Sequence, residues 1–132
     1  MSTAYWCILA AALLPYVWVA VAKASGERYD NRDPRGWLAR QDNPRSVRGA
    51  SAQFNAFEAF APFAAGVLMA QAAGIDPARI SQLALGFVGF RILHGLLYLA
   101  GQARLRSLAW LGGIACVVVL MVSAARAMAS PA

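Results

Sequence analysis

Two groups of polar side chains stand inside otherwise apolar stretches of the sequence. Asn55 and Glu58 belong to the first group, with Arg48 seven residues before Asn55 and Pro62 four residues after Glu58. Steps of seven, three and four residues place side chains near one face of a helix. A charged side chain at membrane depth costs roughly 2.5–3.5 kcal/mol on insertion scales and is kept where it faces a partner or a cavity. Glu58 therefore predicts a polar site inside a helical bundle.

The second group is Arg91, His94 and Tyr98, whose spacing of three and four residues also places them on one helix face. Glu58 and Arg91 are the formal charges deepest in the apolar stretches. The cheapest arrangement pairs them, directly or through Asn55 and water. The pair either fixes helix register as a structural ion pair, or lines a pocket whose arginines bind an anionic ligand or lower a thiol pKa.

Other kinds of chemistry find no support in the residue pattern. His94 is the single histidine, and it lacks Cys or acidic neighbours at metal-ligand spacing, so we expect no metal site. Cys7 and Cys116 lie in apolar runs without CxxC spacing, which is typical of buried small side chains. The sequence contains no nucleophile elbow and no phosphate-binding glycine loop.

The composition indicates a membrane protein. The 132 residues are 60% hydrophobic and 14% charged, whereas a soluble domain is about 45–50% apolar and about 25% charged. The length permits one domain over residues 1–132. The formal net charge is +6, but the basic residues crowd one loop rather than a helix with interleaved aromatics, so no nucleic-acid partner is expected. We predict an all-α integral membrane protein.

Four apolar stretches are long enough to cross the roughly 30 Å hydrocarbon core as helices. We expect them at about residues 4–22, 50–73, 78–100 and 107–128, which predicts a four-transmembrane-helix bundle. The first stretch is interpreted as a retained span rather than a signal peptide, because no Lys or Arg precedes it.

The basic residues predict the orientation of the chain in the membrane. The loop at residues 23–49 holds seven of the twelve basic residues, and none precedes the first span. By the positive-inside bias this loop faces the cytoplasm and both termini face away. In a bacterium the chain would lie in the inner membrane with both termini in the periplasm. The polar side chains then fall in the cytoplasmic half of the bundle.

The two groups also resemble a known family. Arg48, Asn55 and Glu58 form an R-x6-N-x2-E pattern, and residues 90–110, FRILHGLLYLAGQARLRSLAW, carry Arg, His and Tyr followed by Arg-Ser. Together they resemble the MAPEG superfamily of membrane-associated proteins in eicosanoid and glutathione metabolism, which includes microsomal glutathione transferases and the microsomal prostaglandin E synthase. The resemblance covers nearly the whole chain and suits a short, bacterial-type member. It implies a homotrimer of four-helix subunits, with glutathione as co-substrate between adjacent subunits.

The resemblance further implies roles for individual residues. The family's thiol-activating Arg at the start of the fourth span matches Arg106, with Ser107 beside it, while Arg104 stays possible. The implied function is a glutathione-dependent transferase or peroxidase that acts on a hydrophobic electrophile arriving from the lipid. The positions implied to bind glutathione are Arg48, Asn55, Glu58, Arg91, His94 and Tyr98.

Two departures from the family pattern favour an alternative. Phe54 stands where synthase-type members often have a basic residue, and Ser51 stands where many bacterial members carry a second Arg. A hydrogen bond to a charged group contributes about 1.5–3 kcal/mol, so its loss weakens glutathione binding. The alternative is a non-catalytic lipid-binding or scaffolding membrane protein of the same fold. A small transporter or channel is a third hypothesis, which requires a pore formed by an oligomer.

Overall fold

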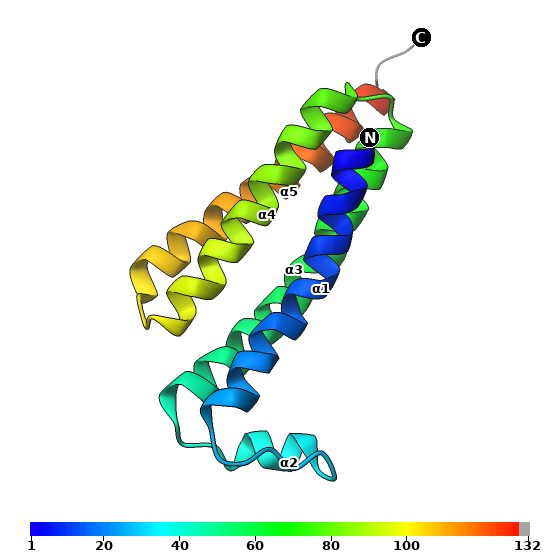
Figure 1. The fold of residues 1–132 in the computed structure, drawn as a ribbon. Coiled ribbons are helices and arrows are strands. Elements are labelled where there is room, and N and C mark those ends of the chain that lie inside the picture. Colours follow the sequence, from blue (N-terminus) through cyan, green and yellow to red (C-terminus); the bar gives the residue numbers. More distant parts are fainter. Residues whose placement is uncertain (130–132) are drawn as a thin grey trace.

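The computed structural model describes residues 1–129. These residues form five α-helices and no strand (Figure 1). Four helices are long and one is short. They are α1 (Ser2–Ser25), α2 (Pro34–Ala39), α3 (Pro44–Ala72), α4 (Pro77–Leu99) and α5 (Ala103–Ala129). The all-α prediction is therefore confirmed for the described part of the chain.

Three helices begin at an acidic or amide side chain followed by proline. Asp33, Asn43 and Asp76 each accept hydrogen bonds from backbone N–H groups in the first turn of α2, α3 and α4. Proline suits the next position because its φ angle is already helical and its missing N–H has no helical partner there. Helix α3 therefore begins at Pro44, inside residues 23–49, which were expected to form a loop. Ser46 does not cap this helix through its side chain; its hydroxyl donates to the carbonyl of Ala22 at 2.7 Å.

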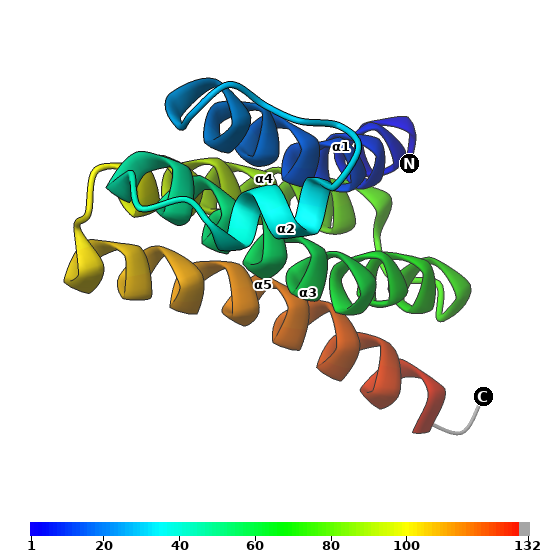
Figure 2. The same cartoon turned by 90° about the horizontal axis from the view of Figure 1, so that it is seen from below.

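The four long helices alternate in direction (Figure 1). Helix α3 packs against α1, α4 and α5, and α1 also packs against α4. Both ends of the described chain consequently lie at one end of the molecule, and the connections α1–α3 and α4–α5 lie at the other. Viewed from that second end, α2 lies over α3 (Figure 2).

The helices are held together by small residues and a few aromatic rings. Phe63 of α3 stacks on Phe87 of α4 with ring centroids 3.9 Å apart and planes 6° apart. Trp18 of α1 is 4% exposed and lies against Gly95 of α4, where an added Cβ would come within 2.0 Å of the indole. Because Gly95 has no side chain, α4 can pack closely against Trp18 of α1, as small residues permit in membrane helices.

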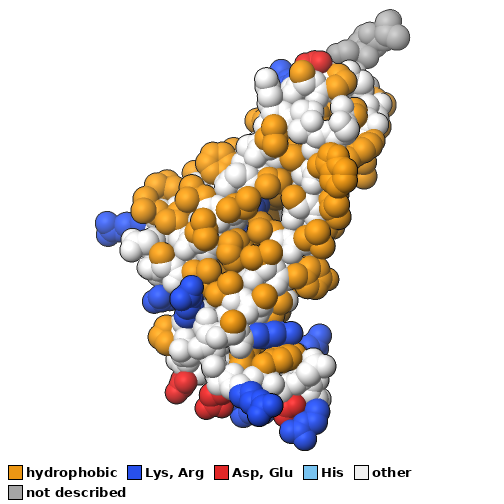
Figure 3. Space-filling view, in the orientation of Figure 1, with side chains coloured by type: hydrophobic (Ala, Val, Ile, Leu, Met, Phe, Trp, Pro, Cys, Tyr) orange, Lys and Arg blue, Asp and Glu red, His pale blue; other side chains and the backbone are white. Residues whose placement is uncertain are grey.

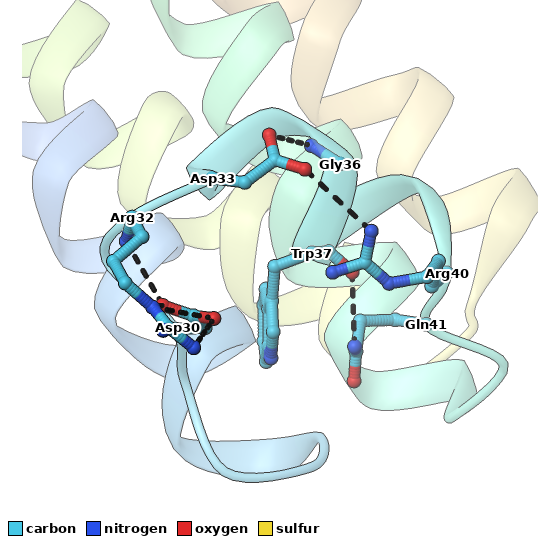
Figure 4. A network of polar contacts seen from close by, with 7 residues as sticks. All are labelled: Asp30, Arg32, Asp33, Gly36, Trp37, Arg40 and Gln41. Atoms are coloured by element: carbon cyan, nitrogen blue, oxygen red, sulfur yellow. Dashed lines mark hydrogen bonds and ion pairs between the residues drawn. The ribbon is translucent and has the colours of Figure 1, made fainter.

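The connection from α1 to α3 is folded around Trp37. This side chain is 3% exposed, and its Nε1 donates to the carbonyl of Arg28 at 3.1 Å. Gln41 donates from Nε2 to the Trp37 carbonyl at 3.0 Å and accepts from the backbone N–H of Glu27 at 3.0 Å. Figure 4 shows the α2 side of this network. Part of the predicted loop at residues 23–49 is therefore an ordered element that packs at the end of α1 and α3 (Figure 1).

Charged side chains on the surface of this connection pair with each other. Arg32 forms an ion pair with Asp30 at 2.9 Å, and Arg40 lies 3.6 Å from Asp33 (Figure 4). The hydrogen bonds from Arg32 hold the pKa of the Asp30 carboxyl below its usual value. Both pairs are solvent-exposed, and such pairs contribute little to stability.

Three helices are long and apolar enough to cross a membrane, namely α1, α4 and α5. The space-filling view shows apolar side chains over the long helices and charged ones gathered near α2 (Figure 3). Helix α3 has 29 residues but does not reach the same hydropathy, because its first half carries most of its polar residues. The predicted crossing at residues 50–73, and with it the four-transmembrane bundle, therefore stays a prediction.

Candidate functional site

The polar residues inside the bundle come from three helices. Asn55 lies on α3 and Arg91 on α4, and Arg91 donates from Nη2 to Asn55 Oδ1 at 2.7 Å. The Arg91 side chain is 3% exposed. Within residues 1–129, both ion pairs lie in the α1–α3 connection, so Glu58 makes none with Arg91. The structure thus shows the Arg91–Asn55 half of the predicted contact through Asn55, and a link from Asn55 to Glu58 stays a prediction.

A first cavity of about 160 Å³ lies between α3, α4 and α5. We call it the apolar cavity, because most of its wall is hydrophobic. Its polar lining consists of Asn55, Glu58 and Arg91. Its other lining residues are Ala59, Pro62, Phe87, Trp110, Gly113, Ile114 and Val117. A cation and a carboxylate thus face a space that is otherwise suited to an apolar group.

A second cavity of about 220 Å³ adjoins the first, and we call it the polar cavity. Its lining residues are Asn55, His94, Tyr98, Arg106, Ser107 and Trp110. The Arg106 guanidinium carbon lies 4.1 Å from the centroid of the Tyr98 ring, and the His94 ring meets Tyr98 edge-on at 5.5 Å. Arg106 is therefore held by an aromatic face, which leaves its charge available to an anion.

Two buried polar atoms beside these cavities lack a hydrogen-bond partner among the described residues. They are Nε of Arg91 and Nδ1 of His94, and both side chains are 3% exposed. Buried polar atoms are nearly always paired in folded proteins, because an unpaired one costs about 1–3 kcal/mol. A ligand or a water molecule in the cavities would remove that cost. This feature distinguishes the region from an ordinary helix contact.

Two arginines from the sequence pattern lie outside both cavities. Arg48 donates from Nη1 to the carbonyl of Leu99 at 3.5 Å, at the turn where Gly101 has a φ of +70°. Its guanidinium therefore meets the C-terminal end of α4, where a positive charge is favourable. Arg104 also lines neither cavity, whereas Arg106 lines the polar one. The structure thus brings together Asn55, Glu58, Arg91, His94, Tyr98, Arg106 and Ser107, without Arg48.

Sequence reasoning missed Trp110, which lines both cavities and is 44% exposed. Helical spacing could have indicated that Trp110 lies near the site, because it follows Arg106 by four residues and Ser107 by three. All three residues therefore share a face of α5. A tryptophan in an apolar helix is usual, and nothing in its own type marked it. Within residues 1–129, no group of three His, Cys, Asp or Glu side chains is placed to hold a metal ion.

Comparison with known proteins places the chain in a family. The model of the MAPEG family matches residues 3–126, which include every residue that lines the two cavities. No curated protein and no solved structure matches the chain. The match confirms the family resemblance of the two sequence motifs.

Proposed function

Because the chain belongs to the MAPEG family, we propose that this multi-pass integral membrane protein is a glutathione-dependent transferase or peroxidase acting on a hydrophobic electrophile. One observation carries the proposal. Arg91 and Arg106 line adjoining cavities, and neither forms an ion pair with the residues that the structure describes. Cationic side chains that line a cavity without an ion-pair partner favour an anionic ligand there.

The donor set fits glutathione, which has two carboxylates and a thiol. Arginine forks pair well with carboxylates, and the unpartnered Nε of Arg91 and Nδ1 of His94 provide further polar contacts. When bound, glutathione supplies the thiol that attacks the electrophile. Arg106 would stabilise that sulfur as an anion, because a nearby guanidinium lowers a thiol pKa from its free value of about 8.5. Ser107 offers a hydroxyl beside it.

The apolar cavity is the proposed place for the electrophile. Phe87, Ile114 and Val117 supply an apolar wall next to the polar cavity, so a hydrophobic group there would lie close to the sulfur. Because the sulfur and the electrophile would be held next to each other, their reaction would not depend on an encounter in solution. The electrophile reaches the cavity from the lipid, which makes membrane lipid and a hydrophobic small molecule the expected partners.

We also propose the family's homotrimer for this chain. Glu58 is exposed on α3 in the single chain although it lines the apolar cavity. A second copy packed on this face would cover the carboxylate and complete the wall of the site. The cytoplasmic position of the site follows from the basic connection between α1 and α3 and is proposed together with periplasmic termini.

Calorimetry of glutathione binding to detergent-purified protein tests the proposed function, and two neighbouring arginines provide a matched pair. Arg106→Ala should weaken binding at least tenfold, because it removes a cation from the polar cavity. Arg104→Ala should change the Kd by less than twofold. Absence of binding to the folded, unmodified protein at millimolar glutathione would contradict the proposal.

The alternative function, lipid binding without catalysis, is favoured by a separate groove. This groove of about 350 Å³ lies between α1, α2 and α3, and Phe54, Phe57 and Tyr16 form part of its wall. Lys23 and Arg35 also line it, so it combines apolar surface with positive charge. If lipid binding is the function, hydrophobic ligands should raise the melting temperature while glutathione leaves it unchanged. A glutathione-dependent rate would exclude this alternative.

A further inference from the structure

The two cavities meet at a pair of side chains. Asn55 and Trp110 are the residues common to both linings. On one side lie the cation and hydroxyl groups of the polar cavity, and on the other lies the mainly hydrophobic wall of the apolar cavity. Asn55 and Trp110 therefore lie at the boundary between the two cavities, beside any group that extends from one to the other.

These two side chains differ in how firmly they are held. Asn55 is fixed by the hydrogen bond from Arg91 at 2.7 Å, and Arg91 is itself buried. Trp110 is 44% exposed and makes no side-chain hydrogen bond within residues 1–129. Its indole is large and rigid, so it contributes to the boundary by its shape rather than by a polar contact. Trp110 is thus the shared boundary residue whose side chain no hydrogen bond within residues 1–129 fixes.

We propose that Trp110 is a specificity-determining residue, which limits the bulk of the electrophile that can lie next to the glutathione sulfur. This inference rests on the proposed function and adds a residue to it. The polar cavity, together with Asn55 and Arg91, holds the peptide part of glutathione, and the hydrophobic wall of the apolar cavity takes the group that is joined to its sulfur. Trp110 forms the wall between them and contributes apolar surface to both.

The structure offers a second position with the opposite effect. Gly113 lies one turn after Trp110's neighbour Ala109 on α5 and lines the apolar cavity. A Cβ added there meets its nearest atom, Cδ of Arg91, at 3.6 Å, which is ordinary van der Waals contact. Gly113→Ala therefore reduces the space of the apolar cavity without a clash and leaves Trp110 in place.

S-substituted glutathiones test the inference, because each carries the peptide part and a chosen group on sulfur. The Kd values of glutathione, S-methylglutathione and the bulkier S-benzylglutathione would be measured by calorimetry for the unmodified protein, Trp110→Ala and Gly113→Ala. In Trp110→Ala the benzyl compound should gain at least tenfold in affinity relative to the methyl compound. In Gly113→Ala it should lose at least threefold. Each variant is judged by the ratio of the benzyl Kd to the methyl Kd, so that any common change in affinity for the peptide part of glutathione cancels.

The outcomes separate this inference from the proposed function. Equal changes for the methyl and benzyl compounds in Trp110→Ala would overturn the role of Trp110 while leaving glutathione binding in place. Absence of glutathione binding to the unmodified protein would overturn the proposed function and this inference with it. Trp6→Ala is the control for loss of a tryptophan, because Trp6 lies on α1, is 70% exposed and lines neither cavity. A selectivity change of the same size in that variant would also count against the inference.

Discussion

At the scale of single residues, the ring of Tyr98 is a partner for Arg106 that leaves the guanidinium charge unneutralised. The cation lies 4.1 Å from the ring centroid, and a cation–π contact contributes about 0.5–1 kcal/mol at exposed sites. Tyr98→Phe keeps this contact, whereas Tyr98→Leu removes it. We expect the apparent pKa in the pH–rate profile of glutathione conjugation to rise in the Leu variant only. Equal shifts in both variants would assign the effect to the hydroxyl instead.

Asn55 is expected to be important for stability as well as for the site. Asn55→Leu removes the acceptor of the Arg91 hydrogen bond and leaves a further donor of a buried guanidinium unpaired, which costs about 1–3 kcal/mol. A lower melting temperature in detergent should result. Asn55→Asp keeps an acceptor oxygen in the same place and should restore most of the loss. If the Asp variant is as unstable as the Leu variant, the hydrogen bond is not the cause.

Some site residues were predictable and others were not, for reasons of geometry. Asn55 and Glu58 reach the apolar cavity as their spacing on one helix face predicts. Arg48 shares that face by periodicity, but it lies about 10 Å further along the axis at 1.5 Å per residue. There its long side chain meets the end of α4 instead. Periodicity gives the direction in which a side chain points around its helix. It does not show which residues of the neighbouring helices lie at the same level along the axis.

At the scale of the helices, the packing of α1 on α4 depends on one glycine. Gly95→Ala would place a methyl group against the Trp18 ring, so α1 and α4 must separate. Gly89 lies on the same helix, and an added Cβ there meets nothing within 4 Å. Alanine is the better helix former by about 0.8–1.0 kcal/mol. Gly95→Ala should therefore lower the melting temperature, and Gly89→Ala should leave it equal or higher. Matching losses would exclude the contact with Trp18 as the cause.

Helix starts were the elements that local sequence predicts best. The Asp76-Pro77 pair marks the beginning of α4, next to the predicted start at residue 78, because the cap and the proline act within one turn of the chain. The start of α3 was less visible, since its first turns are polar and resemble a loop in composition. Its cap at Asn43 acts in the same local way. The placement of Trp37 under the α1–α3 connection depends on distant packing, which local patterns do not contain.

At the scale of the whole molecule, the direction of the helices predicts where the termini lie. The four long helices alternate, so four crossings place both termini on one side of the membrane, and three crossings place them on opposite sides. We expect alkaline phosphatase fused at either terminus to be active in a bacterial host. The same reporter inserted after Arg40 should be inactive, because that connection is predicted to be cytoplasmic. Activity at one terminus only would show that α3 does not cross.

The unpartnered atoms of Arg91 and His94 lower the stability of the fold while they provide polar contacts for a ligand. An apolar side chain of similar size at position 94 removes the cost of a buried nitrogen that has no partner within residues 1–129. A laboratory selection for heat resistance alone would accordingly enrich changes such as His94→Leu. The selected variants would be more stable and would bind polar ligands more weakly. Stabilising substitutions at functional sites commonly reduce function. In this chain the compromise between stability and binding concerns Arg91 and His94, which both lie on α4.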